Sequence, residues 1–175
     1  MSDFRRYYWD SSVFCSFLSE EEGRFQIVQD LLDEAHAGRI EIITSSFSLV
    51  EVLKLKGHEK ITEAQEVQLT TFFEYPFIKI VNATRDVCEF ARNYVWRHGM
   101  APKDAVHMAS AEFAAKVAPI HSIFSWDSDF VNLNGKTGMK IQISHPFMHQ
   151  GLLRLEDSTE AESGSPEPGE PSISN

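Results

Sequence analysis

The sequence contains little cysteine and no long apolar run. Its two cysteines, Cys15 and Cys88, are too few for a disulfide framework and lack the C-x-x-C spacing of zinc or redox sites. No uncharged apolar run approaches the roughly 18 residues that cross a bilayer. The first residues also show no apolar stretch followed by a small-residue cleavage site. We therefore expect a cytoplasmic protein without a membrane segment, in which both thiols are reduced and buried.

Positive charge is also scarce, and it is unevenly spread. The 175 residues include 26 acidic and 16 basic side chains, which gives a formal net charge of -10. All 16 basic residues precede position 155, whereas residues 156–175 hold six acids, three prolines and no Lys or Arg. Such a segment buries too little apolar surface to offset the entropy of ordering it. We expect a disordered acidic tail at 156–175 and one folded domain at 1–150.

The folded part alternates between two kinds of segment. Short runs rich in β-branched and aromatic residues are separated by longer runs of helical period, which is typical of an α/β fold with a mostly parallel, here five-stranded, sheet. We expect strands at 5–9, 39–44, 77–81, 120–125 and 140–144. We expect helices at 12–18, 21–37, 46–56, 59–73, 84–98 and 102–117.

Acidic residues follow the predicted strands at several points. Asp10 comes directly after the first strand, and Asp127 follows the fourth, with Asp129 two residues later. Glu51 lies early in the helix after the second strand, and Asp104 begins the helix that leads to the fourth. Because right-handed crossovers bring the carboxyl ends of parallel strands to one edge, these acids are expected to converge there.

Each acid also has a purely structural explanation. Asp10 and Asp127 suit the caps of a helix or short turn, and Ser48 with Glu51 fits the S-x-x-E capping box. Asp104 suits the positive end of a helix dipole. Taken together the acids are harder to explain in this way, because clustered carboxylates repel one another unless a cation neutralises them.

The ligand types favour a hard metal ion. With no cysteine pair and no H-x-x-x-H spacing, carboxylate oxygens remain, and these select Mg²⁺ or Mn²⁺ over Zn²⁺. Such ions generate a nucleophilic hydroxide and stabilise the leaving oxygen during phosphodiester hydrolysis. The hypothesis from the residues is a metal-dependent nuclease in which Asp10, Asp104 and Asp127 hold the ion. Glu51 either bridges to a water or acts as base.

Four motifs in this order resemble those of the PIN-domain ribonucleases, and of the VapC-type toxins in particular. They are YYWDSSVF around Asp10, the helical Glu51, DAVHMASA at Asp104 and SWDSDF around Asp127, within about residues 5–145. The resemblance implies a three-layer α/β/α fold and a metal-dependent endoribonuclease acting on RNA, commonly a homodimer. It also implies the toxin role in a type II pair with a small antitoxin protein. The residues matching the family's metal-binding acids are Asp10, Glu51, Asp104 and Asp127, with Asp129, Ser125 and Ser12 at accompanying positions.

The sequence departs from the family at its end, because the small toxins usually stop soon after the last strand. This chain adds about 30 residues, including the acidic tail.

Basic and histidine residues near Asp104 are weaker candidates. Arg97 and Lys103 flank the Gly99 loop before Asp104 and are candidates for contacts with RNA phosphates. His107 lies three residues after Asp104 on the same helix face. Because Met108 and alanines surround it, we expect a histidine that serves in packing.

Two other functions stay open. A Mg²⁺-dependent phosphatase-like α/β protein would carry D-x-D after its first strand, but here the third residue is Ser12. The second alternative is a catalytically silent RNA-binding or regulatory module whose acids are structural.

Overall fold

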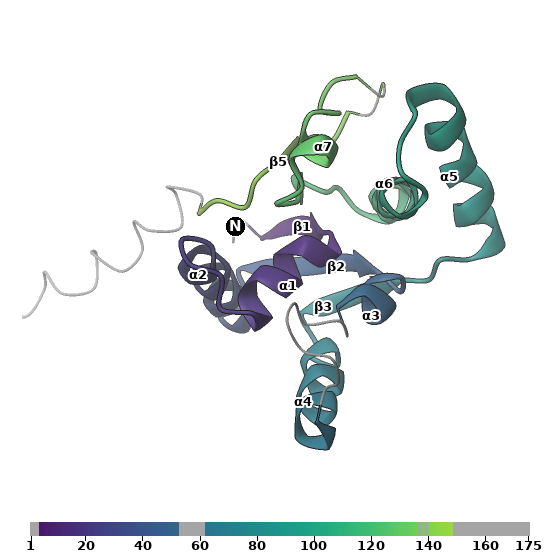
Figure 1. Ribbon diagram of the computed structural model, residues 1–175. Coiled ribbons are helices and arrows are strands. Elements are labelled where there is room, and N and C mark those ends of the chain that lie inside the picture. Colours follow the sequence, from purple (N-terminus) through teal and green to yellow (C-terminus); the bar gives the residue numbers. More distant parts are fainter. Residues whose placement is uncertain (1–3, 53–61, 137, 139, 149–175) are drawn as a thin grey trace, which may run out of the picture.

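The computed structural model describes residues 4–52, 62–136, 138 and 140–148. Five described strands form one sheet in the order β3-β2-β1-β4-β5, and every neighbouring pair is parallel (Figure 1). The strands are β1 (Arg5–Trp9), β2 (Ile40–Ser45), β3 (Ile78–Val81), β4 (Ser122–Phe124) and β5 (Gln142–Ser144). The predicted strand positions are confirmed to within two residues at each end.

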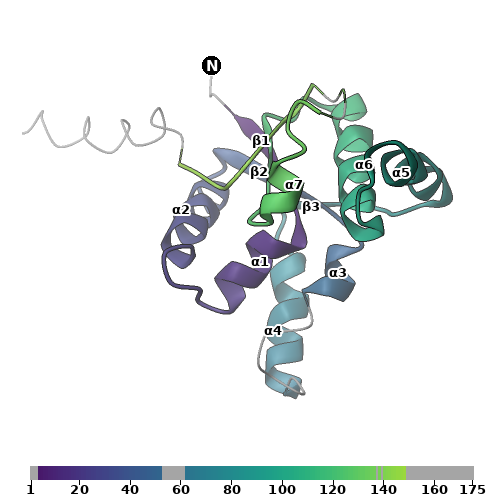
Figure 2. The ribbon, with the colours of Figure 1, turned by 45° about the horizontal axis from the view of Figure 1, so that its top comes forward.

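Helices cover both faces of the sheet, so the predicted three-layer α/β/α fold is confirmed (Figures 1 and 2). One face carries α1 (Ser11–Leu18) and α2 (Phe25–His36), and the other carries α5 (Arg85–His98) and α6 (Pro102–Val117). The remaining helices are α3 (Ser48–Glu51), α4 (Glu63–Phe73) and α7 (Ser128–Val131). No helix of the described residues is both long and apolar enough to cross a membrane.

Strand β1 explains why two cores form. Side chains alternate between the faces of a strand, so Tyr7 and Trp9 join the core under α1, α2 and α4. Tyr8 points the other way and packs with residues of α5 and α6. All three side chains are at most 2% exposed. The central strand is therefore buried on both faces, as is usual for parallel sheets.

The order of the strands brings the ends of β1 and β4 together. From β1 the chain continues to β2 on one side, while β4 pairs with the other side of β1. Open α/β sheets bind ligands at such a switch point, outside the carboxyl ends of the strands. We call the side where β1, β2, β4 and β5 end the carboxyl edge, and the opposite side the amino edge.

Some predicted boundaries were wrong. Helix α2 begins at Phe25 instead of position 21, because Gly23 has a φ of +76°, a left-handed conformation that a right-handed helix cannot contain. Cys15 is half-buried and Cys88 is exposed, although both were expected to be buried; the buried positions of α5 are Val87, Ala91 and Tyr94. The helix predicted at 46–56 is seen as α3, and residues 53–61 lie outside the described part. So does the predicted acidic tail.

Candidate active site

Asp10 lies at the carboxyl end of β1 and is almost completely buried, with 5% of its surface exposed. Its Oδ1 accepts hydrogen bonds from the backbone of Ser12 and Val13, at 3.0 and 3.4 Å, and from Ser12 Oγ at 2.6 Å. Its Oδ2 accepts a hydrogen bond from Ser125 Oγ at 2.6 Å. Asp10 thus caps α1, as the structural explanation proposed. The same side chain is also tied to β4, which a cap does not require.

Ser12 and Ser125 connect Asp10 to the loop after β4. Ser12 Oγ accepts the backbone N–H of Trp126 at 2.8 Å, and Ser125 Oγ accepts that of Asp127 at 2.9 Å. Both hydroxyls therefore donate to Asp10 and accept from this loop. Asp127 in turn caps α7, its Oδ1 accepting from the backbone of Asp129 and Phe130. The carboxyl ends of β1 and β4 are fixed relative to each other by these two serines.

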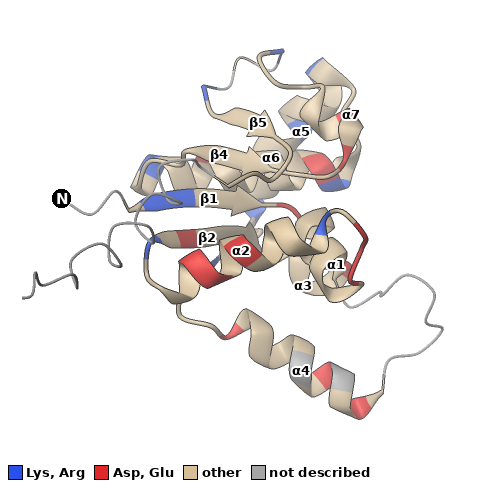
Figure 3. Cartoon of the chain, turned by 90° about the vertical axis from the view of Figure 1, so that its left-hand side faces the viewer, with Lys and Arg blue, Asp and Glu red and all other residues tan. Residues whose placement is uncertain are grey.

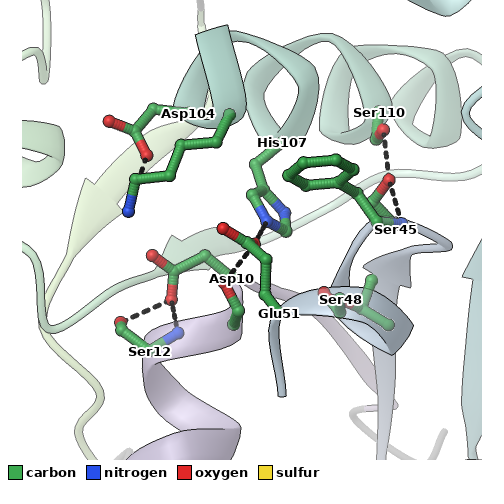
Figure 4. A network of polar contacts seen from close by, with 12 residues as sticks. Asp10, Ser12, Ser45, Ser48, Glu51, Asp104, His107 and Ser110 are labelled. Atoms are coloured by element: carbon green, nitrogen blue, oxygen red, sulfur yellow. Dashed lines mark hydrogen bonds and ion pairs between the residues drawn. The ribbon is translucent and has the colours of Figure 1, made fainter. Parts of the chain in front are cut away.

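Glu51 reaches the site from α3, on the far side of β1 from β4. Its Oε2 lies 2.8 Å from Nε2 of His107, a residue of α6, and accepts a second hydrogen bond from Ser11 Oγ (Figure 4). The side chains of His107 and Glu51 are 3% and 19% exposed. Three elements, α1, α3 and α6, therefore meet at one carboxylate.

The ring of His107 joins Glu51 to Tyr8. A carboxylate only accepts, so Nε2 of His107 donates to Glu51, and Nδ1 shares a 2.9 Å hydrogen bond with the Tyr8 hydroxyl. Burial raises the pKa of Tyr8 well above its ordinary value, which keeps that hydroxyl protonated. Burial alone would raise the pKa of Glu51, but the hydrogen bonds from His107 and Ser11 outweigh it and hold the pKa below its usual range. Glu51 is thus an ionised carboxylate in a fixed orientation.

Hydroxyl groups near the end of β2 and at the start of α3 hold α3 in position. Thr44 Oγ1 donates to the carbonyl of Trp9 at 2.8 Å and shares a 2.7 Å hydrogen bond with Ser48 Oγ. The predicted capping box is therefore wrong: Phe47 occupies the N-cap without a side-chain hydrogen bond, and both Ser48 and Glu51 are used in contacts with other elements. The first turn of α3 is fixed to β1, and Glu51 is fixed with it.

Asp104 faces the same region from the first turn of α6 (Figure 4). Lys103 Nζ is 3.7 Å from Asp104 Oδ1. Burial lowers the pKa of Lys103, but the charges of Asp104, Glu51, Asp127 and Asp10 outweigh it and raise the pKa. One ammonium therefore lies in the combined field of all four predicted acids.

The buried acids do not ionise freely. Burial raises the pKa of Asp10, and the nearby His107, Ser12 and Ser125 only partly oppose it. The pKa of Asp104 is raised first by burial and then by the charges of Asp127 and Asp10, in spite of Lys103. Lys103 is 54% exposed, so water screens it and a single ammonium does not neutralise the group.

These residues fit a hard divalent cation in donor type and charge. The four carboxylates supply oxygen donors, and their field already acts on an ammonium at the same edge. As the side chains stand, no three His, Cys, Asp or Glu side chains of the described residues are close enough to hold one ion. Joint ligation by Asp10, Asp104 and Asp127 stays a prediction.

The other predicted site residues lie further out. Asp129 is exposed in the first turn of α7, where its backbone N–H donates to Asp127. Arg97 is exposed in the last turn of α5. Lys103 is thus the predicted basic residue that the structure brings to the acids.

The structure also corrects the interpretation of His107. It is buried, as expected, but it holds Glu51 instead of serving only in packing. The available signal was its spacing from Asp104, which places both residues on one face of α6. Its pairing with Glu51, 56 positions away, has no local signal in the sequence.

Solved structures of similar fold include several toxins. VapC20 of Mycobacterium tuberculosis, a Sarcin-Ricin loop cleaving toxin, aligns with a TM-score of 0.55 and 17% identity over 71% of this chain and 92% of its own. A toxin-antitoxin complex from Klebsiella pneumoniae aligns with 0.52 and 15% over 82% and 99%. VapBC2 from Rickettsia felis, bound to a promoter DNA fragment, aligns with 0.51 and 15% over 80% and 98%.

A family model gives a more direct result than these distant structures. No curated protein matches the sequence significantly. The model of the PIN domain, however, matches residues 7–135. That range extends from β1 to the loop after α7 and includes Asp10, Glu51, Asp104 and Asp127. The chain belongs to the PIN domain family.

Proposed function

We propose that this protein is an endoribonuclease that hydrolyses RNA phosphodiester bonds with the help of Mg²⁺ or Mn²⁺. The observation that carries the proposal is the placement of Asp10, Glu51, Asp104 and Asp127, from four separate segments, at the carboxyl edge. A structural role explains the caps made by Asp10 and Asp127. It does not explain why four acids gather around one largely exposed lysine, Lys103, and one histidine, His107, among the described residues.

Each acid has a distinct part in this proposal. Asp10, Asp104 and Asp127 would hold the ion, with Asp129 as a further candidate ligand from α7. When bound, Mg²⁺ or Mn²⁺ lowers the pKa of a bound water and stabilises charge on the phosphate oxygens. Ser12 and Ser125 keep Asp10 and the loop of Asp127 in place through their hydrogen bonds.

Glu51 is suited to orient the attacking water. It is ionised and held by His107 and Ser11 through one oxygen, Oε2. An oriented carboxylate accepts a hydrogen bond from water and directs its lone pair toward the phosphorus atom. Lys103, the exposed cation beside Asp104, is placed to contact a phosphate, and Arg97 is a candidate for a second phosphate contact.

The proposal extends to a toxin role. The solved relatives include a Sarcin-Ricin loop cleaving toxin and two toxin-antitoxin assemblies, all with the fold of this chain. We infer by analogy that the chain is the toxin of a type II pair, with a small antitoxin protein as partner, and that it forms a homodimer. Expression of the chain alone should then arrest bacterial growth, and Asp10→Asn should relieve the arrest. Growth arrest by both forms would contradict the toxin role.

A cleavage assay with purified protein tests the enzymatic proposal. Single-stranded RNA should be cut with Mn²⁺ present and stay intact with EDTA, and added Mn²⁺ should restore cutting. Asp10→Asn should lose cleavage, because a neutral amide still accepts the capping hydrogen bonds but supplies no charge. Asp30→Asn, the same substitution on α2, is the matched control and should cleave normally. Metal-dependent cleavage by Asp10→Asn at the wild-type rate would overturn the proposed site, and absence of cleavage by the wild type would favour the silent RNA-binding module.

A further inference from the structure

A third strand contributes an aromatic residue to the carboxyl edge. His145 directly follows β5, just as Asp10 follows β1, and the residue is exposed. The ring stacks on Trp126 with centroids 5.5 Å apart and an interplanar angle of 22°. Trp126 stands between Ser125 and Asp127, so the stack borders the acids directly. We call His145, Trp126 and Arg24 the aromatic shelf.

The shelf is held rigidly from several sides. The Nε1–H of Trp126 donates to Ser16 Oγ at 2.9 Å, and its backbone N–H donates to Ser12. The guanidinium of Arg24 lies 4.9 Å from the centre of the Trp126 ring and pairs with Glu21 at 2.8 Å. The shelf is thus anchored to α1, to the loop after it and to β4.

The His145 ring is fixed as well. Its Nδ1 lies 3.0 Å from the carbonyl oxygen of Ser125, and because a carbonyl only accepts, this nitrogen carries a proton. Pro146 follows and is buried, and a residue before proline is restricted to extended backbone conformations. A ring already held in place loses little entropy when a ligand stacks on it.

We infer that His145 stacks against an unpaired nucleobase of the RNA, next to the phosphate that would contact the ion held by the acids. The inference rests on the proposed function and adds a contact that orients the substrate. Bases of single-stranded RNA stack on aromatic side chains, histidine included, and such contacts tolerate any sequence. Ser125 links the ring to the acids: its carbonyl accepts the hydrogen bond from His145, and its hydroxyl lies 2.6 Å from Asp10. A base stacked on His145 would therefore lie beside the acids.

Binding measurements in the Glu51→Gln background, which keeps the three acids that would hold the ion, separate stacking from cleavage. The probe is a labelled single-stranded RNA oligonucleotide of mixed sequence, with Mn²⁺ present. Adding His145→Ala should weaken binding about 5- to 100-fold, the usual loss for one stacked base. His145→Phe keeps an aromatic face without the ring nitrogens and should bind within about threefold of the parent. The matched control is His121→Ala, which removes an exposed histidine beside Tyr7 at the amino end of β4.

A second signal reports stacking itself. An RNA that carries 2-aminopurine should lose fluorescence on binding to the parent and to His145→Phe, and lose much less with His145→Ala. Equal affinity and equal quenching for the alanine variant, in a protein whose wild type cleaves RNA, would overturn this inference alone. That result would favour a protein partner for His145. A wild type that neither cleaves nor binds RNA would overturn both the proposed function and the shelf.

Discussion

The two edges of the sheet differ in whether their acidic side chains are paired with basic ones (Figure 3). At the amino edge two acids pair with arginines: Arg6 pairs with Glu41 at 2.8 Å, and Arg39 binds both oxygens of Glu34 at 2.5 and 2.6 Å. At the carboxyl edge the charges of four acids act on one largely exposed lysine, 3.7 Å from Asp104. The same sheet therefore has one balanced edge and one with an excess of negative charge.

The difference between the two edges separates acids with a structural role from acids with a functional role more clearly than any single residue does. Paired surface charges add little stability and carry no information about a ligand. Unbalanced carboxylates cost stability, and their presence at a strand-end switch point is best explained by a cation that the protein binds. The amino edge therefore provides controls of matched chemistry for the carboxyl edge.

The largest effect is expected for Glu51→Gln. The amide still accepts the hydrogen bond from His107, so the fold should persist, but it is a poor acceptor for the attacking water. We expect RNA cleavage to fall about 100- to 1000-fold, the usual contribution of a positioned acid or base. Single-turnover rates measure this loss. The comparison of edges would fail if Glu41→Gln, at the balanced edge, caused the same loss.

Two substitutions of His107 test whether the orientation of Glu51 matters for RNA cleavage. His107→Gln leaves a side-chain N–H that can donate to Glu51, whereas His107→Ala removes the donor. We expect the alanine variant to lose about 10- to 100-fold in activity, the scale measured for partners that orient site residues. The glutamine variant should retain most of it. Equal activity of the two variants, at equal folded fraction by circular dichroism, would indicate that His107 serves only in packing.

Asp10→Asn should make the metal-free protein more stable at neutral pH. The pKa of Asp10 in the folded state is raised, so folding disfavours its charged form. The stability of the wild type relative to the variant should therefore fall as the pH rises from the ordinary carboxyl range through the raised pKa. We expect a difference of about 1 kcal/mol at pH 7, or roughly 2–4 °C in Tm. Thermal unfolding in EDTA at pH 4 and pH 7 measures it, and a less stable variant at pH 7 would disprove the cost of this charge.

The smallest effect is expected at the amino edge. Glu41→Gln breaks the ion pair with Arg6. The side chain of Arg6 is 31% exposed and that of Glu41 is 18% exposed. Such pairs contribute about 0.5 kcal/mol, and salt screens them. Chemical denaturation at low and high salt should show a small loss that disappears at high salt, with RNA cleavage unchanged. A loss of cleavage would show that the two edges are not functionally distinct.

The fold was predictable because its signals are local. Apolar runs and helical periods located the strands of the sheet, and Gly99, with a φ of 65°, ends α5 as expected. Parallel topology then placed Asp10 and Asp127 at one edge. The start of α2 was missed because the conformation of Gly23 depends on the turn from Glu21 to Arg24.

Contacts within the site were less predictable. The pairs His107–Glu51 and Trp126–His145 join residues that are 56 and 19 positions apart, and no spacing rule encodes them. Ser48 matched a capping pattern, yet its hydroxyl bonds to that of Thr44, which also donates to the carbonyl of Trp9 on the neighbouring strand. Tertiary packing overrode the local rule in each case.

Direct Mn²⁺ binding tests the central claim, that the excess charge at the carboxyl edge forms a cation site. Electron paramagnetic resonance measures free Mn²⁺ as the metal is titrated into the protein without RNA. We predict saturable binding by the wild type and by Glu41→Gln, and loss of that binding in Asp10→Asn. Equal binding by Asp10→Asn, or no saturable binding by the wild type, would contradict the account.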